Sequence, residues 1–325
     1  MALLEMRDVH LTYSTAAGDV PAVRGVNLAV QAGEVLGVAG ESGCGKSTLA
    51  STVLRLYPKS ARVSGEVLLN GEDVLTMRWG RLRAARWSEA AVVFQGALHS
   101  LNPIQRIGKQ LTEPILLHDP TATPKSASAK VRQLLDHVGL PTSYVDAYPH
   151  QLSGGQKQRV MIALALSCDP EVLVADEPTT ALDVMVQAQI LDLMSAVARE
   201  LQMAVLFISH DLSVLGSTCD RVAVMYAGRI IEEGPARDVF DSPKHPYTRA
   251  LSAAFPTIGD RASRYAPSGL PGDPPYPADL PSGCPFHPRC PDALPVCPTV
   301  DVKLRHAGPQ REAACVLVGQ PAAVE

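Results

Sequence analysis

Short hydrophobic runs alternate with longer helical patterns along most of this chain. The runs end in polar residues or glycine, as buried parallel strands do, and they are Val35–Ala39, Ala91–Phe94, Val172–Ala175 and Val205–Ser209. Helices are predicted where hydrophobic residues recur at helical spacing, over Lys46–Leu56, Lys125–Val138, Gln156–Leu166 and Val184–Leu201. The alternation predicts an α/β fold with a parallel core sheet covered by helices.

Two pairs of segments have the pattern of antiparallel strands. Val9–Tyr13 and Val26–Val30 alternate hydrophobic and polar residues, which predicts a half-exposed β layer before the core sheet. Val222–Tyr226 and Arg229–Glu232 are separated by Ala227-Gly228, which predicts a closing hairpin.

Composition narrows the class of protein. The chain has 325 residues, of which 46% are hydrophobic, and 29 basic against 33 acidic side chains give a net charge of −4. This balance argues against broad binding of nucleic acid, which usually requires an excess of Lys and Arg. No hydrophobic run approaches the length of a membrane-spanning helix, and the first residues do not resemble a secretion signal, so we expect a cytoplasmic protein.

The end of the chain differs in composition from the rest. Of 27 prolines, 14 lie between Pro256 and Pro321, and four of the seven cysteines are also in this part. We therefore predict a main domain over residues 1–242 and a Pro- and Cys-rich extension over residues 243–325.

The strongest chemical signal lies between the strand at 35–39 and the helix that begins at Lys46. It matches G-x-x-x-x-G-K-S and consists of Gly40, Glu41, Ser42, Gly43, Cys44, Gly45, Lys46 and Ser47, followed by Thr48. Glycines in such a loop let backbone N–H groups turn inward around phosphate oxygens, while the lysine reaches the β- and γ-phosphates and the serine binds Mg²⁺. The motif predicts a binding site for a nucleoside triphosphate.

An acidic pair follows the hydrophobic strand at 172–175. Asp176 and Glu177 are expected at the sheet edge where the phosphate loop also ends. Asp176 would hold Mg²⁺, and Glu177 would polarise the water that attacks the γ-phosphate. Such pairs alone often only cap a helix, but the phosphate loop upstream favours the catalytic interpretation.

A second anion-binding turn lies between these two motifs. Ser153, Gly154, Gly155 and Gln156 open a predicted helix, so the chain offers two helix ends that suit phosphate. In this position Leu152–Gln156 resembles the signature of the ATP-binding-cassette family.

Four further residues match that family in the expected order. Tyr13 resembles the aromatic residue that stacks on adenine, and Gln95 resembles the glutamine that contacts Mg²⁺ and the attacking water. Asp183, in Ala181-Leu182-Asp183, resembles the loop that crosses the dimer interface, and His210 resembles the histidine at the γ-phosphate. Each also has a structural interpretation, with Tyr13 covering the β layer, Gln95 bonding a loop and His210 capping a helix.

The resemblance implies particular partners. Two cassettes of the family pair head to tail, so ATP would be held by Gly40–Thr48 of one chain and by Ser153–Gln156 of a second ATPase subunit, identical or distinct. The resemblance further implies ATP and Mg²⁺, two membrane permease subunits and an extracytoplasmic solute-binding protein. The chain would then lie peripherally on the cytoplasmic face of the membrane.

Other stretches resemble the ATPase subunits of dipeptide, oligopeptide and nickel importers. These stretches are Ser100–Pro103, Tyr148–Gln151, Asp176–Asp183, His245–Leu251 and Gly283–Pro291. We therefore expect a peptide importer ATPase, with a nickel or other small-solute importer, a soluble cassette without a transport role, and a metal or redox sensor as alternatives. Gly96–His99 departs from the family pattern in a loop that faces the permease.

The four cysteines of the extension follow C-x5-C-x6-C-x17-C. They are Cys284, Cys290, Cys297 and Cys315. Disulfides are not expected in a reducing cytoplasm, and the paired spacing of a zinc ribbon is missing. Thiolates suit an iron–sulfur cluster or zinc, and related importer subunits carry a four-cysteine tail that can hold a [4Fe–4S] cluster. A [4Fe–4S] cluster, zinc and unligated thiols all stay open. His287, Arg289 and Arg305 could offset the residual negative charge of such a centre, but we interpret them as solvated flanking residues.

Overall fold

The computed structural model of this protein describes residues 2–94, 96, 100–179, 182–254, 270 and 272–318. The chain divides into two compact units, each built from separate segments. Unit 1 comprises Met1–Leu4, Val30–Glu34 and Leu68–Leu206, and unit 2 comprises Glu5–Ala29, Val35–Val67 and Phe207–Glu325. The boundary predicted at residue 242 falls inside unit 2, and the two predicted domain ranges stay a prediction.

Unit 2 contains two β structures. The first consists of the long strands β2, β1 and β4, and the second follows the order β11-β12-β10-β9-β3. The strands are β1 (Ala2–Thr15), β2 (Gly18–Gln31), β3 (Val35–Ala39), β4 (Ala61–Leu69), β9 (Arg221–Tyr226), β10 (Arg229–Pro235), β11 (Arg305–Gly308) and β12 (Arg311–Ala313). β3 pairs in parallel with β9, while β9 and β10 form the antiparallel hairpin that the sequence predicts.

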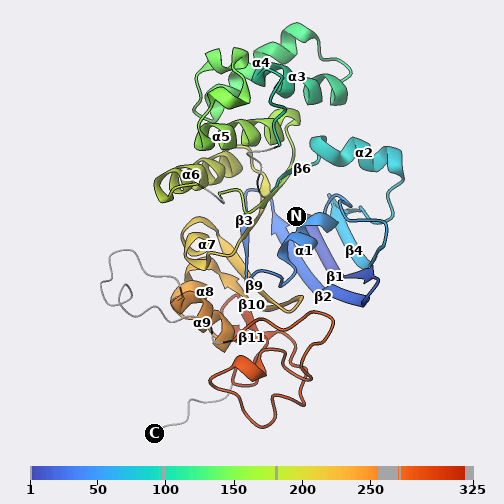
Figure 1. Cartoon of the computed structure of the whole chain (residues 1–325), viewed down its shortest axis with the longest axis vertical. Helices are drawn as coiled ribbons and strands as arrows, with labels where there is room; N and C mark the ends of the chain where they lie inside the picture. The colour runs from blue at the N-terminus through green and yellow to red at the C-terminus, as the bar shows by residue number, and fades with distance from the viewer. Residues whose placement is uncertain are drawn as a thin grey trace. The chain divides into compact units, whose positions relative to one another are not determined.

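The helices of unit 2 are short. They are α1 (Lys46–Thr52), α7 (Leu212–Thr218), α8 (Ala236–Asp241) and α9 (Pro246–Ala253), with a 3-10 turn η5 (His287–Arg289). α7, α8 and α9 contact one another and lie together in Figure 1. β3 is buried at all five positions, as expected for an interior parallel strand.

Unit 1 is mainly helical. Its elements are β5 (Glu72–Asp73), α2 (Trp79–Ser88), β6 (Ala90–Val93), α3 (Ile107–His118), α4 (Pro124–His137), η2 (Thr142–Asp146), η3 (Pro149–Gln151), α5 (Gly154–Ala165), η4 (Leu166–Cys168), β7 (Val172–Asp176) and α6 (Val184–Glu200). β6 and β7 pair in parallel, and α3, α4 and α5 lie next to one another in Figure 1. β8 (Ala204–Ser209) is buried throughout and contains the boundary between the two units.

The C-terminal extension is tied to the preceding segments of unit 2. β12 adds to the edge of β10, where Glu232 pairs with Ala313. The Glu232 carboxylate is fully buried and accepts hydrogen bonds from Arg311 and from the backbone N–H groups of Lys244 and His245, each at 2.8 Å. Because a buried carboxylate without such partners would be costly, this cluster fixes the extension to β10.

The α/β prediction is confirmed, with local differences. The helix predicted over Lys46–Leu56 ends at Thr52, because the chain turns through a left-handed backbone at Arg55 (φ 51°). Helices α2 and α3 and strands β11 and β12 were not predicted. Among the described residues, no helix combines the length and hydrophobicity needed to span a bilayer.

Candidate nucleotide site

Unit 2 builds the phosphate loop between a buried strand and a short helix. β3 delivers the chain to Gly40 (φ 153°), and α1 starts after Gly45 (φ 107°). A Cβ on Gly40 would lie 2.3 Å from the Met225 carbonyl oxygen, and one on Gly45 would lie 2.2 Å from the Ala22 carbonyl oxygen. Both positions therefore require glycine, for backbone conformation and for space.

Lys46 lies folded over this loop. Its side chain is only 5% exposed, and Nζ donates to the carbonyl oxygens of Gly40 at 2.7 Å and Glu41 at 3.0 Å. Cys44 fills the space beside it, with Sγ 3.7 Å from Nζ, and burial raises the pKa of the thiol. The loop thus holds a buried ammonium group against its own backbone, where a phosphate would gain a charge-assisted partner.

The other predicted residues of unit 2 lie in the phosphate loop, in α1, in β1 and directly after β8. Ser42, Gly43 and Ser47 are exposed, and Thr48 is half-buried. The Tyr13 hydroxyl donates to Thr48 Oγ1 at 3.3 Å, so β1 contacts α1 directly. His210 is exposed directly after β8, and Asp211 rather than His210 caps α7, so the capping alternative for His210 is wrong.

Unit 1 carries the acidic pair at the end of a buried strand. Asp176 is the last residue of β7 and is buried, and Glu177 follows with a half-buried side chain. Glu177 has a left-handed backbone (φ 45°), which is unfavourable for a residue with a Cβ. Such strain at the first position after a buried strand is typical of a functional carboxylate held in a required direction.

The signature segment caps a helix of unit 1. Ser153 Oγ accepts from the Gln156 backbone N–H at 3.4 Å, while Gln156 Oε1 accepts from the Ser153 N–H at 2.9 Å. Gly155 is packed against α6, because a Cβ there would lie 2.5 Å from Val186 Cγ1. Gly154 leaves more room, with its nearest neighbour, Leu182, at 3.4 Å. The Ser153 side chain is exposed at this helix end.

The predicted interface residue has a structural task as well. Asp183 is the N-cap of α6, and its Oδ1 accepts from the Val186 N–H at 2.9 Å. Its side chain is otherwise exposed. Gln95, predicted to contact Mg²⁺ and water, and Ala181, before the interface residue, both lie outside the described residues.

Sequence reasoning missed two residues that contact the phosphate loop. The Tyr247 hydroxyl accepts from the Glu41 backbone N–H at 2.9 Å, and Arg289 binds the Glu41 carboxylate. Arg289 is therefore not solvated, and that interpretation is wrong: its side chain is only 7% exposed. The arginine between two closely spaced cysteines, in a segment shared with importer subunits, was the available signal.

The four cysteines of the extension line one small cavity of unit 2, beside Phe286 and Val302. All four are free thiols, and burial raises the pKa of Cys284, of Cys315 and, to about 11, of Cys290. Within the described part of the chain, no three His, Cys, Asp or Glu side chains are gathered closely enough to hold a metal ion. The cavity has suitable donor atoms, but they are not arranged as a ligand set.

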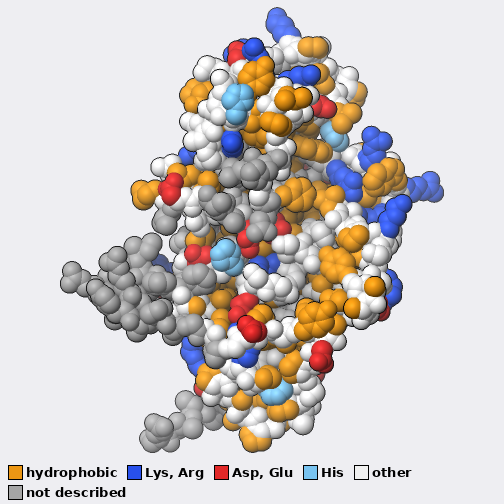
Figure 2. Space-filling view, in the orientation of Figure 1, with side chains coloured by type: hydrophobic (Ala, Val, Ile, Leu, Met, Phe, Trp, Pro, Cys, Tyr) orange, Lys and Arg blue, Asp and Glu red, His pale blue; other side chains and the backbone are white. Residues whose placement is uncertain are grey.

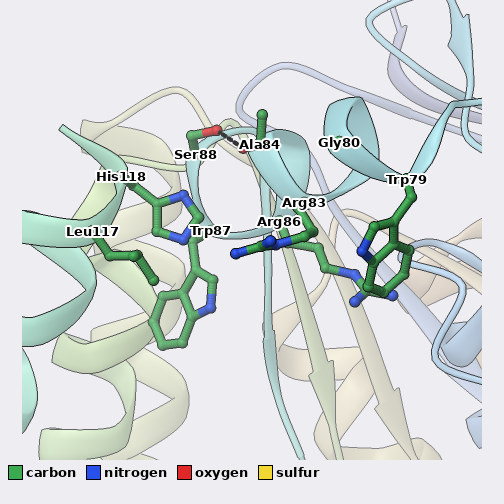
Figure 3. A pocket seen from close by; sticks show the side chains of 9 residues that line it. All are labelled: Trp79, Gly80, Arg83, Ala84, Arg86, Trp87, Ser88, Leu117 and His118. Carbon is green, nitrogen blue, oxygen red and sulfur yellow. Dashed lines mark hydrogen bonds between the residues drawn. The ribbon is translucent and has the colours of Figure 1, made fainter. Parts of the chain in front are cut away.

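A larger cavity in unit 1 is lined by α2 and the end of α3 (Figure 3). It measures about 520 Å³ and contains both tryptophans of the chain, Trp79 and Trp87. The Arg86 guanidinium lies 5.1 Å from the centre of the Trp79 ring. Burial and the charge of Arg83 lower the pKa of His118. Hydrophobic and basic side chains gather over α2 in Figure 2. Such a surface suits a partner segment with acidic and apolar residues.

Comparison with known proteins identifies the family. The family model described as "ABC transporter" matches residues 23–180, and the one described as "Oligopeptide/dipeptide transporter, C-terminal region" matches residues 231–297. "Oligopeptide transport ATP-binding protein OppD" of Salmonella typhimurium is 44% identical over 91% of this chain and 88% of its own length. "Dipeptide transport ATP-binding protein DppD" of Bacillus subtilis is 40% identical over 92% of this chain and 89% of its own.

Solved structures agree with this match. The structure titled "Dimeric Structure of MJ0796, a Bacterial ABC Transporter Cassette" has a TM-score of 0.64 at 27% identity, and the alignment covers 72% of this chain and 99% of that one. The structure of cbiO1 from Clostridium perfringens has a TM-score of 0.64 at 29% identity and covers 74% and 91%. This chain therefore belongs to the ABC transporter family, as an ATP-hydrolysing cassette of the group that includes oligopeptide and dipeptide transport proteins.

Proposed function

We propose that this chain is the ATPase subunit of an importer that drives uptake of di- and oligopeptides through separate permease subunits. The observation that carries the proposal is the joint match of the cassette and of the C-terminal region specific to oligopeptide and dipeptide transporters. Relatives whose names specify oligopeptide or dipeptide transport match over nine-tenths of the chain. The proposed domains are the cassette over residues 1–242 and the peptide-transporter extension over residues 243–325.

In this function the phosphate loop, Gly40–Thr48, binds the triphosphate of ATP. The backbone N–H groups of the loop and the buried Lys46 ammonium group supply positive partners for the phosphates. Tyr13, whose hydroxyl donates to Thr48, stacks on the adenine. Mg²⁺ needs oxygen donors and usually shares its shell with substrate phosphates, so the Ser47 hydroxyl, the Asp176 carboxylate and Gln95 suffice as its protein ligands. When bound, Mg²⁺ neutralises charge that develops on the phosphates.

Two residues act on the γ-phosphate and its attacking water. Glu177 accepts a proton from the water, since a carboxylate fixed after β7 is a suitable general base. His210, exposed after β8, donates a hydrogen bond to the γ-phosphate.

A second cassette completes the site. The exposed Ser153 at the start of α5, with Gly154, Gly155 and Gln156, binds the ATP held by the partner's phosphate loop. Asp183 lies at this interface and keeps α6 capped. Because these groups reach the γ-phosphate only while it is intact, ATP closes the pair of cassettes and hydrolysis releases it.

The remaining partners are two permease subunits, and a solute-binding protein that acts through them. The chain is then a peripheral subunit on the cytoplasmic face of the membrane. The cavity of α2 and α3 supports permease contact in unit 1, since it exposes Trp79 (62% exposed) beside basic side chains.

The extension holds a metal centre in this proposal. Four thiolates can hold a [4Fe–4S] cluster or a zinc ion, and four cysteines line one cavity. Metal binding would draw the thiols into a closer set and deprotonate them, against the burial that now raises the pKa values of Cys284, Cys290 and Cys315. Its role is structural, as a clip for a Pro-rich segment.

Uptake assays test the transport function. In cells that lack this subunit but retain the permeases, restoring the chain should restore uptake of a labelled tripeptide and pentapeptide. Uptake of radioactive nickel should not change, because the C-terminal region matches that of peptide transporters. Restored nickel uptake without peptide uptake would contradict the peptide assignment and favour the small-solute alternative.

Metal analysis tests the centre. Protein purified without oxygen should carry about four irons and four sulfides per chain, with a brown absorption band that is lost in Cys290→Ser. Cys168→Ser is the matched control, because Cys168 is also a partly buried free thiol but does not line the cavity. One zinc per chain would replace the cluster by a zinc clip, and metal-free protein would exclude both.

A further inference from the structure

Glu41 is the second residue of the phosphate loop. Its backbone and its side chain are both bound by segments of unit 2 that are remote in sequence. Its backbone N–H donates to the Tyr247 hydroxyl at 2.9 Å. Its carboxylate accepts two hydrogen bonds from the terminal nitrogens of Arg289, at 2.8 and 2.9 Å. The arginine lies 248 positions further along the chain, in the turn between the first two cysteines of the extension.

This ion pair has the geometry of a strong one. The two terminal guanidinium nitrogens each bind one carboxylate oxygen, and the side chains of Arg289 and Glu41 are only 7% and 21% exposed. Arg289 also donates to the Gly272 carbonyl at 3.1 Å and to the Tyr226 hydroxyl at 3.4 Å. Its guanidinium lies 6.0 Å from the ring centres of Tyr226 and Phe286. Contacts with Gly272, Tyr226 and Phe286 therefore hold the guanidinium group in place beside the loop.

The pair acts on the part of the loop that meets phosphate. Lys46 Nζ donates to the carbonyl oxygens of Gly40 and Glu41, so the ammonium group is positioned by the same residue that Arg289 holds. Glu41 is also the only acidic residue in Gly40–Thr48. Without its partner, this carboxylate would place an uncompensated negative charge beside the triphosphate.

On the basis of the ATP site in the proposed function, we propose that Arg289 is a positioning residue for ATP, which fixes the phosphate loop through Glu41 and neutralises the loop's single carboxylate. The Cys-rich extension thereby supplies part of the nucleotide site, although it lies far from the nucleotide motifs in sequence. Arg289 acts through Glu41 and need not touch ATP.

Variants of the full chain separate this role from a purely structural one. In Arg289→Gln, the dissociation constant for ATP, measured by equilibrium dialysis in EDTA, should rise about tenfold because the carboxylate is left unpaired. The rise should shrink as salt is added, since screening weakens the repulsion. In the assembled transporter, KM for ATP should rise by a similar factor, while kcat at saturating ATP changes less than about twofold.

The double variant Glu41→Gln with Arg289→Gln removes both charges and is the decisive comparison. It should recover most of the lost affinity, and Arg289→Lys, which keeps the charge but not the fork, should lie between it and the wild type. Asp301→Asn is the matched control, because it breaks another ion pair of the extension, with Arg229, and should leave ATP binding unchanged.

Thermal denaturation of each variant reports whether it folds. A dissociation constant for Arg289→Gln within about twofold of the wild type would overturn the proposal. An equal loss in the single and double variants would also overturn it, since a clip that only stabilises the fold predicts no rescue. Should Arg289→Gln fail to fold, Arg289→Lys and the double variant decide. The proposal requires both variants to bind ATP more weakly than the wild type does, but by a factor of less than about ten.

Discussion

Replacing Glu177 by Gln should nearly abolish ATP hydrolysis and leave ATP binding intact. Gln keeps the size of the side chain and the backbone position after β7, but it cannot accept a proton from the attacking water. A general base contributes about 100- to 10,000-fold to the rate, so kcat should fall within this range. The dissociation constant for ATP should stay within about twofold, because the phosphate loop and Lys46 are unchanged.

Phosphate release and equilibrium dialysis measure the two quantities on the same preparation. Glu200→Gln is the matched control, since Glu200 is an exposed carboxylate of unit 1 that pairs with His137, at 3.7 Å. Its kcat should equal that of the wild type. A loss of less than about threefold in Glu177→Gln would show that another group takes the proton.

The strands of the core were predictable because burial on both faces leaves a distinct pattern. Val35–Ala39 was predicted with the bounds that the structure has, and Ala91–Phe94 was displaced by one residue from β6. A strand buried on both faces must be hydrophobic at successive positions, and polar residues mark its end. The short runs therefore carried enough information without any knowledge of tertiary contacts.

Helices α2 and α3 were not predicted, and the physical reason differs between them. α3 contains Pro114, which a sequence pattern treats as a helix breaker, yet Pro114 is buried in this helix. α2 contains Gly80 and closely spaced arginines, and its backbone turns at Trp87 (φ 77°), so it has no continuous hydrophobic stripe. In both, tertiary packing outweighs local propensity.

The positions of the predicted nucleotide residues could be inferred because these residues form contiguous motifs. The phosphate loop, Asp176 and Glu177 follow strands directly, so their position in the sheet follows from the order of the chain. Arg289 has no such relation to Glu41, since hundreds of residues separate the two and nothing local in the sequence indicates their contact. Interpreting Arg289 as a solvated flanking residue failed because burial depends on the tertiary fold of the extension.

The second large effect is expected from Lys46, where substitution should weaken ATP binding itself. In Lys46→Met the hydrophobic stem is kept and the buried ammonium group is lost, together with its hydrogen bonds to Gly40 and Glu41. A hydrogen bond to a charged group contributes about 1.5–3 kcal/mol, so ATP affinity should fall by about 10- to 150-fold. The loop carbonyl oxygens also lose their donor, so the melting temperature should decrease.

Dialysis and calorimetry distinguish these two consequences. Lys130→Met is the matched control, because Lys130 is a partly exposed lysine that is paired with Asp169 in unit 1, away from every predicted nucleotide residue in sequence. Its ATP affinity should not change. Together with Glu177→Gln, the result assigns binding to one residue and hydrolysis to the other, since Lys46→Met weakens ATP binding and Glu177→Gln lowers only kcat. Unchanged ATP affinity in Lys46→Met would show that the ammonium group serves the loop alone and not the phosphates.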